Sequence, residues 1–340
     1  MSLQQGLMTT DGIDLNEILY GTVLPTVEVY NRQEILDLRA LLCSDHDESY
    51  IKFDVSGNWK FEKLGEGQMP QSKKIVWGKT QKDTEKYGLN IGYTYDWLMS
   101  DTASADNIRR MINKAITQDR ALQTAVILDE CLTTGGWFDG TFTAAERITA
   151  PTTFGQNTFT GAHTHYNTSG AATLALATIT SMKEHVKQHG FKGQLWGLMN
   201  ADMTKVIEDL AGWTGAAAAP LTLSGKIVDN VSIEGFAGRL LGVNWKETEW
   251  MPDDYLMIVG TFEGRAGEKP LRYIQKKNPA ARGLILTPGL RPDYPIIDSA
   301  YIHWLEAKAV LRAAGVVYQI TATATYTNPS ITTNVIELGY

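Results

Sequence analysis

Cysteine is almost absent from the 340-residue chain, and the two that occur, Cys43 and Cys131, lie far apart in the sequence. Two isolated thiols cannot build a disulfide framework or a CxxC-type metal site. The chain also contains no GxSxG, GxxxxGK[ST] or GxGxxG motif between a predicted strand and a predicted helix. These are the signatures of common nucleophile and phosphate sites. We therefore expect unpaired thiols, no cofactor and no enzyme activity.

The chain has fewer basic than acidic residues: 31 Lys and Arg and 38 Asp and Glu give a formal net charge of −7 with His neutral. Neutralising phosphates requires clustered Lys and Arg, so the composition argues against a surface that grips nucleic acid everywhere. The first 15 residues have neither the basic start nor the apolar run of a signal peptide, and no membrane span is expected. A hydrophobic content of 43% still predicts a substantial core.

The first 49 residues are predicted to form an arm. They begin with a Gly, Thr and Gln-rich stretch, and a short helix is expected over residues 31–42, with apolar side chains at Ile35, Leu36, Leu38 and Leu42. Because this segment has little core of its own, we expect it to pack on something else.

Residues 50–86 are unusually charged, with eight Lys and five Asp or Glu. Short apolar and aromatic pieces are interrupted at residues 56–58 and 65–70 by turn-forming residues, which predicts a long β-hairpin. An isolated hairpin is marginal in water, so it should lie on another subunit or surface. We expect arm and hairpin to be poorly ordered in an isolated monomer.

A strand and then a very long helix are predicted next. Every second residue from Tyr87 to Tyr95 is apolar or aromatic, the period of a strand with one buried face. Apolar residues at helical spacing follow from residue 104 to 132, with Ser104 as a candidate N-cap and Gly135 near the stop. Asp119 falls near the apolar stripe, and the sequence does not identify its partner.

The rest of the chain alternates helices and strands, which predicts an α+β region. Residues 141–180 are Thr-rich and expected to be mostly extended, with a helix running to His189, a strand from Leu195, and a helix capped by Asn200. Short strands are expected at residues 231–233, 241–245 and 256–259. Residues 301–313 fit either period, and residues 316–327 alternate as a long strand that we expect to pair with residues 87–95.

Local motifs in this order resemble the major capsid proteins of tailed bacteriophages, the Hong-Kong-97-type fold shared with encapsulins. Residues 93–99 resemble that family's lead into its spine helix, and residues 132–135 resemble the end of that helix. The stretch Trp196–Asn200 resembles its W-x-M-N motif, and residues 238–243, 251–252 and 259–262 resemble its L-L-G, M-P and G-D-F run. The resemblance spans nearly the whole chain.

The resemblance implies an α+β structural protein that forms pentamers and hexamers of an icosahedral head around double-stranded DNA. It implies an N-terminal arm (1–49), an extended loop (50–86), a peripheral domain (87–160 and 301–340, with the spine helix 104–132) and an axial domain (161–300). The implied partners are copies of the chain, a portal protein, a scaffolding protein, a possible decoration protein and DNA held by non-specific contact, with no membrane. The implied location is the virion, assembled in the host cytoplasm. The expected assembly contacts are Trp59, Phe61, Lys63, Lys73, Lys74 and Trp77.

Two alternatives remain open. One is an encapsulin-type compartment with the same fold. The other is a secreted β-rich enzyme that binds metal or glycan through His163, His165 and exposed Trp side chains. His163 and His165 face one side of an extended segment but would need a third ligand, and the i, i+4 pair His185 and His189 is interpreted as core edge and helix C-terminus. We therefore predict no metal site.

Overall fold

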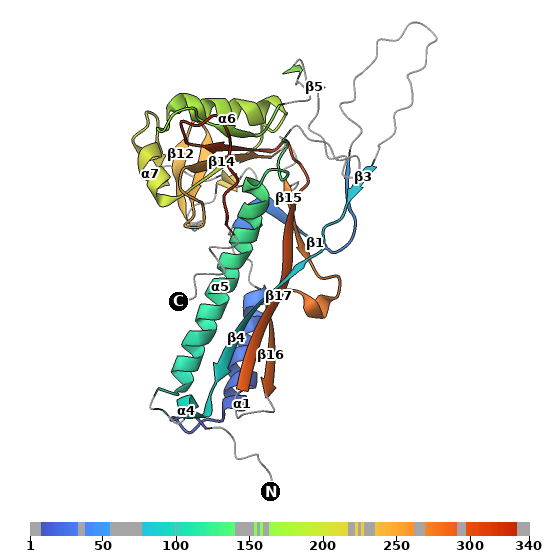
Figure 1. Ribbon diagram of the computed structural model, residues 1–340, viewed down its shortest axis with the longest axis vertical. Coiled ribbons are helices and arrows are strands. Elements are labelled where there is room, and N and C mark those ends of the chain that lie inside the picture. The colour runs from blue at the N-terminus through green and yellow to red at the C-terminus, as the bar shows by residue number, and fades with distance from the viewer. Residues whose placement is uncertain are drawn as a thin grey trace, which may run out of the picture.

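The computed structural model describes residues 8–32, 38–54, 77–98, 100, 102–139, 153–154, 157–158, 163–216, 222–223, 226–227, 235–261, 269–290 and 297–331. They form a rounded upper body and a long lower limb (Figure 1). None of the helices in these ranges combines the length and hydropathy needed to cross a bilayer.

The long helix α5 (Ala105–Leu132) runs the length of the limb (Figure 1). The Ser104 hydroxyl accepts a hydrogen bond from the backbone N–H of Asn107 and caps the helix. This confirms the predicted spine helix. Within the described ranges the other helices are α1 (Leu15–Ile18), the π-helical turn η1 (Leu19–Val23), α2 (Leu24–Arg32), α3 (Leu38–Leu42), α4 (Tyr95–Leu98), α6 (Leu176–Gln188), α7 (Ala201–Glu208) and the 3-10 turn η3 (Pro279–Ala281).

The limb sheet is built around β17 (Ile297–Ala309), which settles residues 301–313 as strand through Ala309. One edge of β17 pairs antiparallel with β4 (Glu85–Tyr93). The other edge pairs with β16 (Ile285–Leu290) and then with β15 (Leu271–Gln275), while β1 (Cys43–Asp47) lies parallel to β15. Outside the large sheets, the described residues form three two-stranded ladders: β2 (Ile51–Asp54) with β3 (Trp77–Thr80), β5 (Thr153–Phe154) with β6 (Asn157–Thr158), and β10 (Thr222–Leu223) with β11 (Lys226–Ile227).

The upper body contains a seven-stranded sheet with α6 packed against β14 and β18 (Figure 1). Helix α7 begins after Asn200, whose side chain accepts from the Met203 N–H, as predicted. The expected strand 241–245 starts only at Val243, because Leu241 adopts a φ of 53° in the turn before it. In order, the strands are β7 (Tyr166–Thr168), β18 (Gly315–Gln319), β14 (Tyr255–Gly260), β8 (Leu195–Met199), β13 (Val243–Glu247), β12 (Phe236–Leu240) and β9 (Thr214–Gly215).

The predicted pairing of the closing strand with residues 87–95 is wrong. β18 pairs with β14 and β7 in the upper sheet, and it ends at Gln319 instead of extending to residue 327. β17 takes the expected place, and pairs with the whole of β4 from residue 297 to residue 305. Alternation identifies a strand with two unlike faces but carries no information about its partner along the edge.

The expectation that the arm packs away from its own subunit is wrong for residues 8–32. Leu15, Leu19, Val23 and Val27 are almost fully buried in one apolar cluster. The same cluster includes apolar residues of α5, among them Ile108. Their spacing of about four residues is helical, so α1, η1 and α2 present one apolar face to the limb.

A buried polar network ties this arm to the limb and supplies the partners of Asp119. Its carboxylate accepts hydrogen bonds from the Tyr30 hydroxyl of α2 (2.6 Å) and the Gln123 amide of α5 (2.7 Å), and its other oxygen lies 2.6 Å from Nδ1 of His303 in β17. Burial alone would raise the pKa of the Asp119 carboxyl, but His303, Tyr30 and Gln123 together lower it below the ordinary 3.8. The ionised carboxylate is therefore the form that holds the three elements together.

We expect Asp119→Asn to destabilise the unassembled chain by about 2–3 kcal/mol at pH 7, because charge-assisted hydrogen bonds contribute that much. A carboxyl whose pKa is lower in the folded than in the unfolded chain stabilises the fold at pH values above its unfolded pKa. This stabilisation is lost as the pH falls through the folded pKa. Urea unfolding should therefore show that the free energies of unfolding of the variant and the wild type differ less at pH 3 than at pH 7. Asp106→Asn is the control, because Asp106 belongs to an exposed ion pair on the same helix. It should lower the free energy of unfolding by less than about 0.5 kcal/mol. A difference independent of pH would contradict this account.

Candidate assembly surface

The predicted hairpin begins as a short antiparallel ladder, from Ile51 opposite Thr80 to Asp54 opposite Trp77. Ile51 is 1% exposed and lies in an apolar cluster with Ile274 of β15. β3 stands out to the side of the body in Figure 1. The root of the hairpin is thus packed into the subunit, although an isolated two-stranded ladder would be only marginally stable.

Charged side chains hold the segment that returns from the hairpin. The Lys82 ammonium lies 3.2 Å from a Glu130 oxygen at the end of α5 and 3.1 Å from a Glu306 oxygen in β17. Burial opposes the charge on Lys82, but the two carboxylates outweigh it and raise the pKa of its ammonium. Glu48 accepts hydrogen bonds from the backbone N–H and hydroxyl of Thr84. The chain segments before β2 and after β3 are therefore both held to the body.

Of the six predicted assembly contacts, five lie outside the described residues: Trp59, Phe61, Lys63, Lys73 and Lys74. Trp77 is the first residue of β3, and its backbone pairs with Asp54. The structure therefore supports the paired root of the predicted hairpin, while residues 55–76 lie outside the described residues and the individual contacts stay predictions.

β4 offers one open edge. One side of this nine-residue strand pairs with β17, and the opposite side has no strand partner among the residues that the structure describes. Most of its side chains are exposed, and Leu89 is 45% exposed. An unpaired strand edge carries a row of N–H and C=O groups that can pair with another chain. Monomeric proteins usually shield such an edge, so its openness favours a subunit of an assembly.

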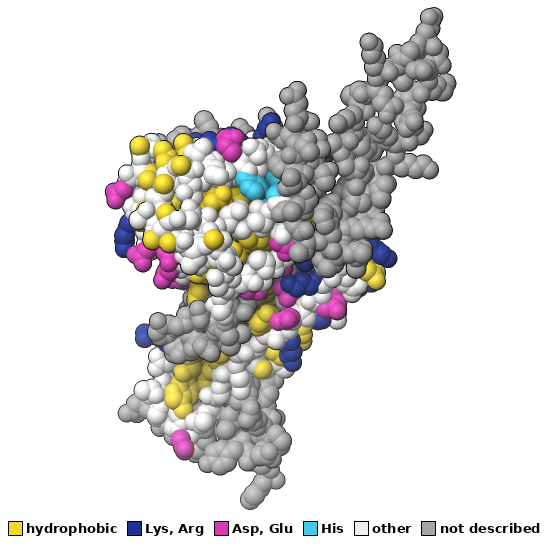
Figure 2. Space-filling view, turned by 45° about the horizontal axis from the view of Figure 1, so that its top comes forward, with side chains coloured by type: hydrophobic (Ala, Val, Ile, Leu, Met, Phe, Trp, Pro, Cys, Tyr) yellow, Lys and Arg dark blue, Asp and Glu magenta, His cyan; other side chains and the backbone are white. Residues whose placement is uncertain are grey.

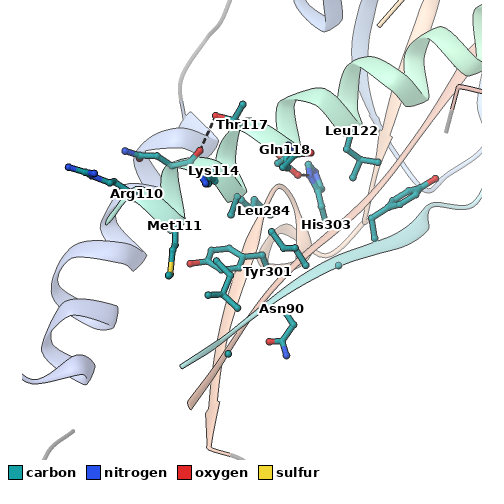
Figure 3. A pocket seen from close by; sticks show the side chains of 18 of the residues that line it. Asn90, Arg110, Met111, Lys114, Thr117, Gln118, Leu122, Leu284, Tyr301 and His303 are labelled. Carbon is teal, nitrogen blue, oxygen red and sulfur yellow. Dashed lines mark hydrogen bonds and ion pairs between the residues drawn. The ribbon is translucent and has the colours of Figure 1, made fainter. Parts of the chain in front are cut away.

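A groove of about 1200 Å³ lies between β4 and residues 110–122 of α5 (Figure 3). Its apolar lining includes Ile91, Met111 and Leu284, and the exposed cations Arg110 and Lys114 lie along α5 at its side. Figure 2 also shows hydrophobic side chains gathered on the lower limb. An apolar groove with a charged rim has the composition of a protein–protein contact.

The arm leaves two apolar side chains exposed on the outside of its helices. Tyr20 is 58% exposed and Val29 is 57% exposed, although their helices bury the opposite face against the limb. Single exposed apolar residues are common on any protein. Together with the β4 edge and the groove, they place candidate contact surfaces at several points along the limb.

The histidines lie differently from expectation. His163 and His165 meet His185 and His189, so the two pairs that the sequence shows about 20 residues apart form one cluster in the upper body. The additional imidazole that the first pair would need to hold a metal is thus present nearby, at His185 of α6. Trp137, Trp196 and Trp245 are buried, so these three cannot stack on a glycan.

No family model matches the chain, and no curated protein matches its sequence. Solved structures do match its fold. A chain of Mycobacterium phage Patience is 21% identical over 97% of both chains, with a TM-score of 0.66. The capsid of a native GTA particle is 11% identical over 85% of this chain and 91% of the other (TM-score 0.53), and the mature capsid of bacteriophage PhiM1 is 9% identical over 84% and 87% (TM-score 0.53). The chain therefore has the predicted α+β, Hong-Kong-97-type capsid fold.

Proposed function

We propose that this protein is the major capsid subunit of a tailed bacteriophage and assembles into pentamers and hexamers of an icosahedral head around double-stranded DNA. The observation that carries the proposal is the match over 97% of both chains to a phage protein. That match spans the limb, the upper body and the root of the hairpin together. At 21% identity the likeness concerns the fold, so the assembly itself is the proposal.

Features of the limb support self-assembly. The open edge of β4, the groove beside α5 and the firmly held hairpin root each offer a surface for another copy of the chain. Repeated contacts between unlike surfaces of identical subunits close into rings. The limb then corresponds to the peripheral domain (87–160 and 301–340) and the upper body to the axial domain (161–300). Two exchanges modify these bounds: β15 and β16, within 161–300, belong to the limb sheet, and β18, within 301–340, belongs to the upper sheet.

The remaining parts of the proposal follow from the same role. The protein is a structural component of the virion, made in the host cytoplasm, and not an enzyme. Its partners are a portal protein, a scaffolding protein and a possible decoration protein. A net charge of −7 suits a shell that encloses DNA through non-specific contacts without gripping it.

Negative-stain microscopy of the expressed chain tests the proposal. We expect closed shells or capsomer rings, and nucleic acid or empty interiors in purified particles. Shells filled with a cargo enzyme would instead support an encapsulin-type compartment. Single particles of monomer size at high protein concentration would overturn the proposal, and stoichiometric glycan binding by those particles would support the secreted-enzyme alternative.

A further inference from the structure

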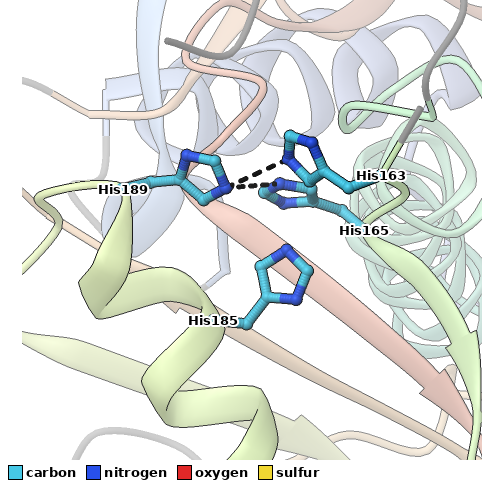
Figure 4. A group of neighbouring side chains, drawn as sticks. All are labelled: His163, His165, His185 and His189. Carbon is cyan, nitrogen blue, oxygen red and sulfur yellow. Dashed lines mark hydrogen bonds between the residues drawn. The ribbon is translucent and has the colours of Figure 1, made fainter. Parts of the chain in front are cut away.

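Four of the six histidines in the chain converge at one place. His163 and His165 lie on the segment that leads into β7, His185 lies in α6, and His189 caps the C-terminus of α6. Their candidate ligand atoms all lie within 4.8 Å of one another, and no carboxylate or thiol belongs to this cluster of described residues. Figure 4 shows the four rings gathered between these two segments.

The rings are oriented with nitrogens toward one another. Nε2 of His189 lies 3.2 Å from Nε2 of His163 and 3.2 Å from Nε2 of His165 (Figure 4). Nδ1 of His165 lies 2.6 Å from the Gly315 carbonyl, so it is the protonated nitrogen, and Nε2 turns a lone pair to the cluster. Nε2 of His185 is buried without a hydrogen-bond partner in the described part of the chain.

Hydrogen bonding alone does not satisfy this arrangement. A neutral imidazole carries one N–H, so His189 can donate through Nε2 to only one of its two Nε2 neighbours. Because Nδ1 of His165 holds the proton of that ring, its Nε2 offers a lone pair, and Nε2 of His189 faces two such neighbours at once. The cluster therefore brings together several nitrogen lone pairs.

We propose that His163, His165, His185 and His189 bind one divalent late transition metal ion of the zinc class. With metal–nitrogen bonds of about 2.0–2.1 Å, two ligands of a tetrahedral site lie about 3.3–3.4 Å apart. The two 3.2 Å nitrogen pairs match such edges. Imidazole nitrogens favour Zn²⁺, Ni²⁺ or Cu²⁺ over Mg²⁺ and Ca²⁺, which take oxygen ligands.

Four protein ligands would make the site structural, since catalytic zinc sites keep one position open for water or substrate. The ion would join the end of α6 to the segment before β7. That segment is already fastened by the His165 N–H to the Phe138 carbonyl at 2.7 Å, and by the Val317 N–H of β18 to the His165 carbonyl at 2.8 Å. In the upper body, the metal would thus link helix α6 to the segment before β7, which is itself hydrogen-bonded to β18 and to Phe138, beyond the end of α5. Histidine side chains reach the surface there in Figure 2, which gives an ion access.

The test uses the purified full-length chain, stripped with EDTA and then titrated with Zn²⁺ or with Co²⁺ as a spectroscopic probe. We expect one ion per chain, the visible absorption of tetrahedral Co²⁺, and a rise of roughly 5 °C in the unfolding temperature when the site is loaded. His163→Ala and His185→Ala should each weaken Zn²⁺ binding at least about 100-fold.

His46→Ala is the matched control, because His46 lies in β1, outside the cluster, and this variant should bind as the wild type does. His163 is only half-buried, so its variant should fold even if changes at His165 do not. Absence of tetrahedral Co²⁺ absorption in the wild type, or equal binding by the cluster variants and His46→Ala, would overturn the proposal. Metal binding is measured per chain, so this result is independent of shell formation.

Discussion

A chain in which residues 55–76 are replaced by Asn-Gly is expected to fold normally and to form no shells. Asp54 and Trp77 are the last paired residues of the β2–β3 ladder, and Asn-Gly forms the two-residue turn that closes such a ladder. The root stays anchored because Ile51 and the Lys82 ion pairs are retained. The change removes the five predicted contacts beyond the ladder, and with them the reach to a neighbouring subunit.

Size-exclusion chromatography and electron microscopy measure the assembly, and thermal unfolding measures the fold. We expect an unfolding temperature within a few degrees of that of the unassembled wild type, and loss of shells by more than about 100-fold. The double variant Trp59→Ala, Phe61→Ala should show a smaller loss in the same direction, since truncating an aromatic anchor costs about 2 kcal/mol or more. Normal shells from the shortened chain would refute the role given to the hairpin.

The elements predicted well from sequence are those encoded by local signals. Helix α5 needs only its apolar period and the Ser104 cap, and α7 needs the cap at Asn200. The hairpin root follows from charge and turn residues. In these cases the information lies within a few residues of the element, so no knowledge of distant partners is required.

The features missed depend on contacts between distant segments. Gly, Thr and Pro interrupt the apolar spacing of the arm from Leu15 to Val27, so this spacing does not predict one continuous helix. The apolar residues of the arm are nevertheless buried, because α5 supplies the surface on which they pack. Asp119 seemed unpartnered because Tyr30 and His303 lie far away in sequence. β4 and β17 likewise lie far apart in the sequence, so neither strand alone identifies the other as its partner.

The histidine cluster shows the same limit at a candidate site. Each histidine pair has a spacing that can chelate a metal, but two ligands are too few for a metal site. The sequence therefore favoured the interpretation that these histidines have no metal-binding role. The fold packs α6 on β18, beside β7, and so brings both pairs together. A search for two incomplete ligand pairs on neighbouring predicted elements would have raised the possibility.

Leu89→Lys is expected to abolish assembly while leaving the subunit stable. Leu89 is 45% exposed on the open edge strand β4, and it lines the groove beside α5. A new cation at an exposed position changes the free energy of unfolding by less than about 0.5 kcal/mol. If a neighbouring copy covers this strand, burying the ammonium costs about 2 kcal/mol or more at every copy of the contact. Since 1.4 kcal/mol corresponds to a tenfold change in an association constant, the association constant of each contact falls roughly 30-fold. This loss is repeated at every copy of the contact around the shell.

Val206→Lys supplies the matched control for this change. Val206 is also an exposed apolar residue, at 38%, but it lies on α7 in the upper body, far from β4 (Figure 1). Sedimentation should find Leu89→Lys as monomers or small oligomers and Val206→Lys in shells, with equal urea unfolding curves for the two unassembled chains. If Leu89→Lys forms shells as readily as Val206→Lys does, the β4 edge faces solvent in the assembly. The contact surface then lies elsewhere on the limb, because a cation cannot be buried there without a measurable loss of association.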